Sequence, residues 1–348
     1  MYHKTEVQKP SFYSGPISII SLFLLSLLIF SAAAPAFGRE VVVYSARKEH
    51  LIQPLFDAYT RETGTRIKYI TGKAGVLLER IRAEGKNTPA DLLLTVDAGN
   101  LWHAAEGGIL QAVSSRTLAN NIPAHLRDPG NMWFGLSVRA RTIVYNTEKV
   151  KPEDLSTYES LAEPGWKGRL VLRTSKKVYN QSLVAMFLAE HGDKKTEEIV
   201  SGWVANLAAQ PFSSDTKVLE AIAAGLGDVG IVNTYYYGRL MKKKPNLPLK
   251  LYWPNQGTNG VHVNTSGAGV TLHAKHREEA VKLLEWLSSE TAQNLFADSN
   301  MEYPANPRVE PHRLVLAWGK FKQNLNNLEN AGKFQAASVR IMDRAGYR

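Results

Sequence analysis

Strand-like and helix-like segments alternate along this 348-residue chain, and the alternation limits the folds that it can adopt. Short apolar or alternating runs indicate strands, while longer runs with helical periodicity indicate helices, the first of which should end at Gly64. The expected strands cover residues 40–44, 66–70, 90–95, 169–173 and 229–233, and the expected helices cover 50–63, 76–84, 181–191, 196–207 and 216–224. This order predicts an α/β protein in which helices cover a sheet of largely parallel strands.

The first 36 residues have the pattern of a secretory signal peptide. Lys4 and Lys9 precede an apolar run over 17–30, and the small residues around Ala36 suit a cleavage site. The alternative is that this segment stays in place as a membrane anchor, because its apolar stretch approaches spanning length. The chain has no cysteine, so neither a lipidated cysteine nor a disulfide is possible. We therefore expect cleavage near Ala36 and a soluble protein in the periplasm.

The chain is basic, with a formal net charge of +10. The predicted signal holds two lysines and one glutamate, so its removal would leave a net charge of +9. This charge favours anionic ligands or surfaces. Its charges are scattered, and the one compact basic run, 242–244, is expected to be a solvated helix end, so we do not expect nucleic-acid binding. The roughly 310 residues that remain are too many for one ordinary core and favour two lobes.

Candidate site residues follow three of the expected strands. Arg47 follows the strand over 40–44, Tyr179 follows 169–173 after a short loop, and Tyr235-Tyr236 directly follows 229–233. Ligands of α/β proteins collect at the carboxyl ends of strands and between lobes. Phenolate oxygen is a hard ligand that suits Fe(III), an ion acidic enough to displace a phenol proton of pKa ~10. The alternative for the tyrosine run is that its rings fill a core or line a cleft wall.

Several short motifs occur in a characteristic order and spacing between Val41 and Pro307: Val43-Tyr44-Ser45-Ala46-Arg47, Pro89-Ala90-Asp91, Trp133-Phe134-Gly135-Leu136, Arg139-Ala140-Arg141, Val144-Tyr145-Asn146, Tyr179-Asn180-Gln181-Ser182, Asn233-Thr234-Tyr235-Tyr236 and Glu302-Tyr303-Pro304-Ala305-Asn306-Pro307. In these motifs the chain resembles the periplasmic ferric-ion-binding proteins of ABC-type iron importers, which belong to the bacterial extracellular solute-binding proteins.

The resemblance implies a two-lobed periplasmic-binding-protein fold, type II-like, that is hinged by crossing strands. The first lobe would comprise residues 37–138 plus about 265–310, and the second 139–264 plus about 311–348. It also implies a monomer that hands Fe(III) to an inner-membrane ABC permease. Tyr235 and Tyr236 would be iron ligands and Tyr179 a third, as in the three-tyrosine class, while Tyr237 would point into packing.

The chain departs from the family pattern in the first lobe. Lys48 and Glu49 stand where some relatives place a histidine, or a histidine and a tyrosine, and Val96 stands where others place a glutamate. We therefore expect an anion socket in this lobe, in which Arg47 and Arg139 hold a synergistic carbonate through bidentate hydrogen bonds. The remaining octahedral position is left open between water, Glu49 and Asp97. The alternative for each arginine is a surface or hinge ion pair.

Two other functions compete with ferric transport. One is a carrier for an oxyanion or phosphonate that would use Arg47 and Arg139, with the tyrosines as cleft walls. The other is an iron-phenolate metalloenzyme. No nucleophile motif supports catalysis, so we expect the chain not to be an enzyme. His273 and His276 have a spacing that suits a metal, but no carboxylate or third ligand joins them locally, so a solvated helix end is expected.

Overall fold

The computed structural model describes residues 1–10 and 39–348, which fall into two separate units, Met1–Arg39 and Glu40–Arg348. Residues 1–10 are exposed and have no regular secondary structure. The predicted apolar run over 17–30 and the predicted cleavage site at Ala36 lie outside the described residues. Within residues 1–10 and 39–348, no helix combines the length and the apolar character needed to span a bilayer.

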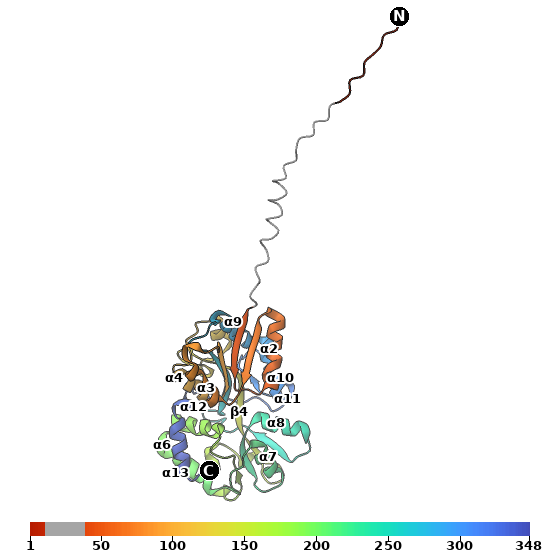
Figure 1. Cartoon of the computed structure of the whole chain (residues 1–348). Coiled ribbons are helices and arrows are strands. Elements are labelled where there is room, and N and C mark those ends of the chain that lie inside the picture. The colour runs from red at the N-terminus through yellow and green to blue at the C-terminus, as the bar shows by residue number, and fades with distance from the viewer. Residues whose placement is uncertain (11–38) are drawn as a thin grey trace. The chain divides into compact units, whose positions relative to one another are not determined.

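The unit Glu40–Arg348 contains α-helices, strands and short 3-10 helices (Figure 1). The strands are β1 (Glu40–Ser45), β2 (Arg66–Thr71), β3 (Leu92–Val96), β4 (Phe134–Asn146), β5 (Leu170–Val171), β6 (Val229–Asn233), β7 (Leu249–Tyr252), β8 (Val263–Val270) and β9 (Tyr303–Pro304). The helices are α2 (Glu49–Thr63), α3 (Ala74–Glu84), α4 (Ala98–Glu106), α5 (Arg116–Asn121), α6 (Val178–Ala205), α7 (Asp215–Ala223), α8 (Thr234–Lys243), α9 (Arg277–Leu287), α10 (Glu290–Asn300), α11 (Arg313–Leu316), α12 (Asn330–Lys333) and α13 (Gln335–Arg344).

Two glycines mark where helices end or break. Gly64 ends α2 in a left-handed conformation with φ 72°, and its amide donates to the carbonyl of Thr60, as expected of a glycine C-cap. Gly192, with φ 70° and ψ 178°, interrupts α6. The interruption falls between the two helices predicted over 181–191 and 196–207.

The long strand β4 joins the two halves of this unit. Its residues 134–140 pair with β8, and its residues 141–145 pair with β6. Figure 1 shows α2, α3, α4, α9 and α10 gathered around one end of β4, and α6, α7, α8 and α13 around the other. The fold is thus α/β with two lobes that share a crossing strand. The residue boundaries predicted for the lobes stay a prediction.

The predicted strand directions were only partly right. The strand order β2-β1-β3-β8-β4-β6-β5 contains parallel pairs at β1–β2, β1–β3 and β5–β6, as the βαβ rhythm predicts. However, β8 runs antiparallel to β3, and β4 runs antiparallel to β6, β7, β8 and β9. The sheet is therefore mixed, because the crossing strands run against the βαβ strands beside them.

Candidate metal-binding cleft

One cleft brings together the three tyrosines and the two arginines that the sequence singles out. Tyr179 lies in the first turn of α6, and Tyr235 and Tyr236 lie in the first turn of α8. All three line this cleft together with Arg47 and Arg139. The rings of Tyr235 and Tyr236 have centroids 4.5 Å apart. Tyrosines from α6 and α8 in one half of the fold therefore face Arg47, which follows β1, in the other.

The start of α8 explains how two consecutive tyrosines can face one cleft. In a strand, neighbouring side chains point to opposite faces, whereas a helix turns by about 100° per residue. Because β6 ends at Asn233 and α8 begins at Thr234, Tyr235 and Tyr236 follow helical geometry. Tyr237 turns away, as expected: it is buried, packs edge-on against Trp318, and donates a hydrogen bond to the Leu249 carbonyl at 3.3 Å.

Cationic side chains surround the tyrosine rings. The Arg239 guanidinium carbon lies 4.9 Å from the Tyr235 ring centroid and 4.7 Å from that of Tyr236. Arg139 lies 5.5 Å from the Tyr179 centroid, and Arg173 lies 5.3 Å from the same centroid. These separations fall in the range of cation–π contacts. The cleft can therefore compensate negative charge that develops on phenol oxygens.

Burial keeps the phenols of Tyr179 and Tyr235 neutral in the metal-free protein. It raises the pKa of Tyr235 well above its ordinary value, and negative charge on Tyr179 or Tyr236 would raise this pKa further. Burial also raises the pKa of Tyr179, although the nearby Arg139 opposes the rise. A cation that binds these oxygens must displace their protons, so only a strongly Lewis-acidic ion can use them near neutral pH.

Arg47 is engaged in an ion pair. Both of its terminal nitrogens donate to the same Glu302 carboxylate oxygen at 3.0 Å, and Nη1 also donates to Ser137 Oγ at 3.1 Å. Burial alone would raise the pKa of Glu302, but Arg47, and secondarily Arg139, holds this pKa below its ordinary value. The ion pair considered as the alternative for Arg47 is therefore present, and it offsets the charge that Arg47 could offer to an anion.

Arg139 is less fully engaged than Arg47. Its Nη1 donates to Ser266 Oγ at 3.4 Å, and its Nη2 lies 3.7 Å from Asp97 Oδ2, which is beyond normal hydrogen-bond length. Nη2 is buried and has no hydrogen-bond partner among residues 1–10 and 39–348. Arg139 therefore retains a donor for an anion in the cleft.

Asp97 and Glu49, the two candidates for an additional ligand, are engaged in other contacts. Asp97 is buried at the start of α4 and accepts hydrogen bonds from Gly99 N, Ser182 Oγ and Asn264 Nδ2. Burial raises the pKa of Asp97 despite the nearby Arg139. Glu49 accepts a hydrogen bond from the Tyr69 hydroxyl at 3.2 Å. Neither side chain lines the cleft, whereas Val96 does.

Sequence reasoning missed several residues of the cleft. Arg239 follows Tyr235 by four positions, so helical spacing could have placed it beside the tyrosines. Glu302 lies in one of the recognised motifs, but its pairing with Arg47 has no local signal. Outside the cleft, sequence reasoning also missed the partner of His276, whose Nδ1 lies 2.9 Å from Asp91 Oδ2. That contact depends on residues 185 positions apart.

Known proteins resemble this chain in sequence. Residues 87–322 match the family model described as "Bacterial extracellular solute-binding protein". The chain is 44% identical over 323 residues to "Iron uptake protein A1" of Synechocystis sp., covering 91% of this chain and 90% of that protein.

Solved structures of similar proteins share the fold. One is the IdiA (FutA) protein of Trichodesmium in complex with iron and citrate ligands, with 44% identity and a TM-score of 0.86 over 89% of this chain and 100% of that one. Another is ferric iron-binding protein A of Mannheimia haemolytica in an open conformation, with 36% identity and a TM-score of 0.84 over 89% and 99% of the two chains.

Proposed function

This chain belongs to the bacterial extracellular solute-binding proteins, and from that premise we propose that it is a periplasmic carrier that binds ferric iron and delivers it to an ABC-type permease. Its relatives include an iron uptake protein and a protein solved with iron and citrate, and the chain is a binding protein rather than an enzyme. The observation that carries the proposal is the convergence of Tyr179, Tyr235 and Tyr236 on one cleft.

The chemistry of the three tyrosines favours Fe(III) over divalent ions. Three phenolates carry three negative charges and so neutralise Fe(III), while phenolate oxygen is a hard donor that matches this hard ion. The raised pKa values of Tyr179 and Tyr235 mean that protons must be displaced, which a weakly acidic divalent ion does poorly.

A carbonate and a water would together complete the coordination shell. Two carbonate oxygens added to three phenolates leave one octahedral position for water. The unpartnered Nη2 of Arg139 supports this arginine as the principal anion contact, with Arg47 in a lesser role because Glu302 already binds it. The Trichodesmium relative was solved with iron and citrate, and a citrate carboxylate offers the same paired oxygens.

The division of ligands between elements suggests an order of events. Iron would bind first to the tyrosines on α6 and α8, and closure onto the anion held by Arg139 would complete the shell. Protonation of the phenolates or reduction to the softer Fe(II) would then favour release to the permease. We further propose that the protein acts as a monomer and that its signal peptide is cleaved near Ala36.

A ferric titration of residues 37–348, with and without bicarbonate and followed by visible absorbance, tests this function. We expect a phenolate-to-iron charge-transfer band that saturates at one equivalent and is stronger with bicarbonate. No band at any ferric concentration would remove the tyrosine site from the proposal. A band that does not respond to bicarbonate would keep the iron site and remove the carbonate.

The basic lining of the cleft favours one alternative, a carrier for an oxyanion or phosphonate. Arg47, Lys48, Arg139 and Arg239 all line the cleft, and the one cleft carboxylate, Glu302, is already paired. In that case calorimetry would show binding of a phosphonate without iron, Arg139→Gln would abolish that binding, and ferric ion would produce no colour.

A further inference from the structure

A second group of metal-binding side chains lies outside the cleft. Glu159 begins a 3-10 helix, η4 (Glu159–Ala162), while Glu190 and His191 lie on α6 directly before its interruption at Gly192. One ligand atom from each of Glu159, Glu190 and His191 lies within 4.8 Å of the others. Within residues 1–10 and 39–348, no other group of three or more histidine or carboxylate side chains meets this condition.

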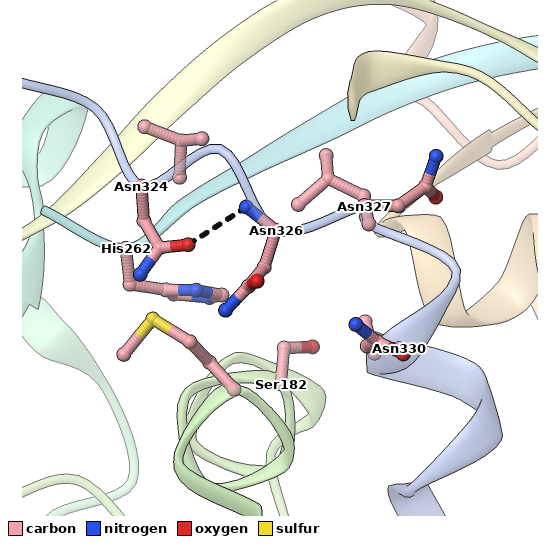
Figure 2. A pocket seen from close by; sticks show the side chains of 10 residues that line it. Ser182, His262, Asn324, Asn326, Asn327 and Asn330 are labelled. Carbon is pink, nitrogen blue, oxygen red and sulfur yellow. Dashed lines mark hydrogen bonds between the residues drawn. The ribbon is translucent and has the colours of Figure 1, made fainter. Parts of the chain in front are cut away.

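Neighbouring amides fix the orientation of both carboxylates. Asn255 Nδ2 donates to Glu159 Oε2 at 2.9 Å, which leaves Oε1 facing His191. The side-chain amides of Asn324 and Asn326 both donate to Glu190 Oε1, which leaves Oε2 on the side of His191. Figure 2 shows Asn324 and Asn326 close together, with the Asn326 backbone amide donating to Asn324 Oδ1 at 2.9 Å.

The free oxygen of Glu190 is the observation that points to a ligand. The Glu190 side chain is only 6% exposed, yet its Oε2 has no hydrogen-bond partner in the part of the chain that the structure describes. The His191 ring lies 3.0 Å from Glu159 Oε1 but 3.9 Å from Glu190 Oε2. A buried carboxylate oxygen without a partner is unfavourable, and a bound cation would satisfy it.

We propose that Glu159 Oε1, Glu190 Oε2 and His191 Nε2 form a binding site for a divalent transition-metal ion of the zinc class. Tetrahedral zinc with bonds of ~2.0–2.2 Å places neighbouring donors about 3.3 Å apart. The observed separations of 3.0 and 3.9 Å bracket that value, so small side-chain movements suffice. One imidazole and two carboxylates balance a divalent charge and match the donor preference of zinc.

An ion can reach this site from solvent, and neighbouring side chains hold its ligands in place. His191 and Glu159 keep 27% and 24% of their side-chain surface exposed, so an ion can enter beside them and water can fill the fourth position. The His191 ring stacks on Phe187 with centroids 5.9 Å apart, which restricts its orientation. The asparagine contacts to the carboxylates are the kind of outer-shell bonds that orient metal ligands.

Zinc at this site would connect segments that are distant in the sequence. Glu190 contacts Asn324, whose backbone amide donates to the Val261 carbonyl at 2.9 Å, two residues before β8. A bound ion would join η4 to α6. Through Glu190 it would also fix α6 relative to Asn324 and Val261. The site shares no residue with the cleft, so it does not depend on the proposed ferric function.

Zinc titration by calorimetry of residues 37–348 tests the proposal, in a Tyr235→Phe/Tyr236→Phe background that weakens competing binding in the cleft. We expect one equivalent of Zn²⁺ to bind, and Glu190→Gln and His191→Gln each to lower the zinc affinity at least tenfold. His276→Gln is the matched control, because His276 pairs with a single carboxylate, that of Asp91. Equal zinc affinity in the background protein and in Glu190→Gln would overturn the proposal.

Thermal unfolding separates metal binding from a structural effect. Zinc should raise the melting temperature of the background protein in a concentration-dependent way and leave that of His191→Gln unchanged. His191 is partly exposed, so this variant should fold even if Glu190→Gln does not. Anomalous scattering at the zinc edge from soaked crystals should give a peak between the three side chains. A protein whose melting temperature does not respond to zinc, or crystals without this peak, would refute the site.

Discussion

Each cleft tyrosine offers iron a single phenol oxygen, so removing one hydroxyl tests one ligand at a time. We expect Tyr179→Phe and Tyr236→Phe each to lower ferric affinity by more than the ~100-fold that loss of an outer-shell partner can cost. The unfolding free energy of the metal-free protein should change by less than about 1 kcal/mol, since at most one hydrogen bond is lost. Chelator competition followed by visible absorbance measures the affinity. Tyr237→Phe is the control, because its hydroxyl bonds Leu249 away from the cleft; equal affinities in Tyr236→Phe and Tyr237→Phe would contradict the ligand assignment.

Ferric binding should release protons. Burial raises the pKa of Tyr179 and of Tyr235, so both phenols are protonated at neutral pH without metal. Each iron–phenolate bond then releases one proton, and below the phenol pKa each released proton lowers ferric affinity about tenfold per pH unit of acidification. A titration with ferric nitrilotriacetate in weak buffer should release about one proton fewer in Tyr179→Phe than in the wild type. The same proton count in both would show that Tyr179 is not a ligand.

The two cleft arginines should respond differently to substitution. Arg47→Gln leaves Glu302 buried without its cation, and breaking such a pair typically costs about 3–5 kcal/mol of unfolding free energy. Arg139→Gln should instead abolish the bicarbonate dependence of ferric binding, because Arg139 has a terminal nitrogen without a partner and Asp97 keeps three other hydrogen bonds. Urea unfolding and ferric titration of both variants measure the two effects. Wild-type bicarbonate dependence in Arg139→Gln would assign the anion to another residue.

The positions of the strands and helices could be predicted from the sequence more fully than the directions of the strands. The predicted strands over 40–44 and 229–233 match β1 and β6 within one residue, because their residues are apolar and bounded by clear breaks. The antiparallel direction of β4 and β8 follows from chain crossings between lobes, which local periodicity does not encode. The sequence could indicate the tyrosines because they follow the carboxyl ends of predicted strands, where α/β proteins bind ligands.

Helix α8 carries two of the tyrosines, and its packing against Met301 and Trp318 requires a glycine at position 238. A Cβ added at Gly238 would lie 2.6 Å from Met301 Sδ and 2.8 Å from the Trp318 ring. We expect Gly238→Ala to shift α8, to lower the unfolding free energy by about 1–3 kcal/mol, and to weaken ferric binding. Denaturant unfolding and ferric competition measure both. Gly75→Ala on α3 is the control, because no atom lies within 4 Å of its added Cβ; wild-type ferric affinity in Gly238→Ala would show that the tyrosines do not need this packing.

For the whole molecule, the sequence could predict two lobes and a cleft but not the pairings that cross the fold. Arg47 and Glu302 are 255 residues apart, and Glu159 lies 32 positions from His191, so only tertiary structure brings these groups together. Asp97 was a candidate ligand by position, yet the fold buries its carboxylate among hydrogen-bond donors. Polar partners that are distant in the sequence therefore decide which candidate residues are free to bind a ligand.

Buried His262 should make the stability of the whole molecule sensitive to acid. It lies directly before β8 and lines the pocket with Asn324 and Asn326 (Figure 2). Burial, reinforced by the charges of Arg141 and Arg139, lowers the pKa of His262 from 6.5 to about 3. Below the pKa of ~6.5 in the unfolded chain, the unfolded state takes up a proton that the folded state does not. The stability due to neutral His262 is thus complete above pH ~6.5 and falls by about 1.4 kcal/mol per pH unit as the pH drops towards the folded value.

Substitution of His262 should therefore flatten this acid response. Between pH 7 and 4.5 the wild type should lose about 2–3 kcal/mol more unfolding free energy than His262→Asn, as measured by urea unfolding of the metal-free protein. His50→Asn, at an exposed position on α2, should behave as the wild type. Equal losses in all three proteins would show that His262 does not titrate on unfolding. If the difference is found, iron loss in acid must be compared in wild type and His262→Asn, because only loss common to both reflects phenolate protonation rather than unfolding.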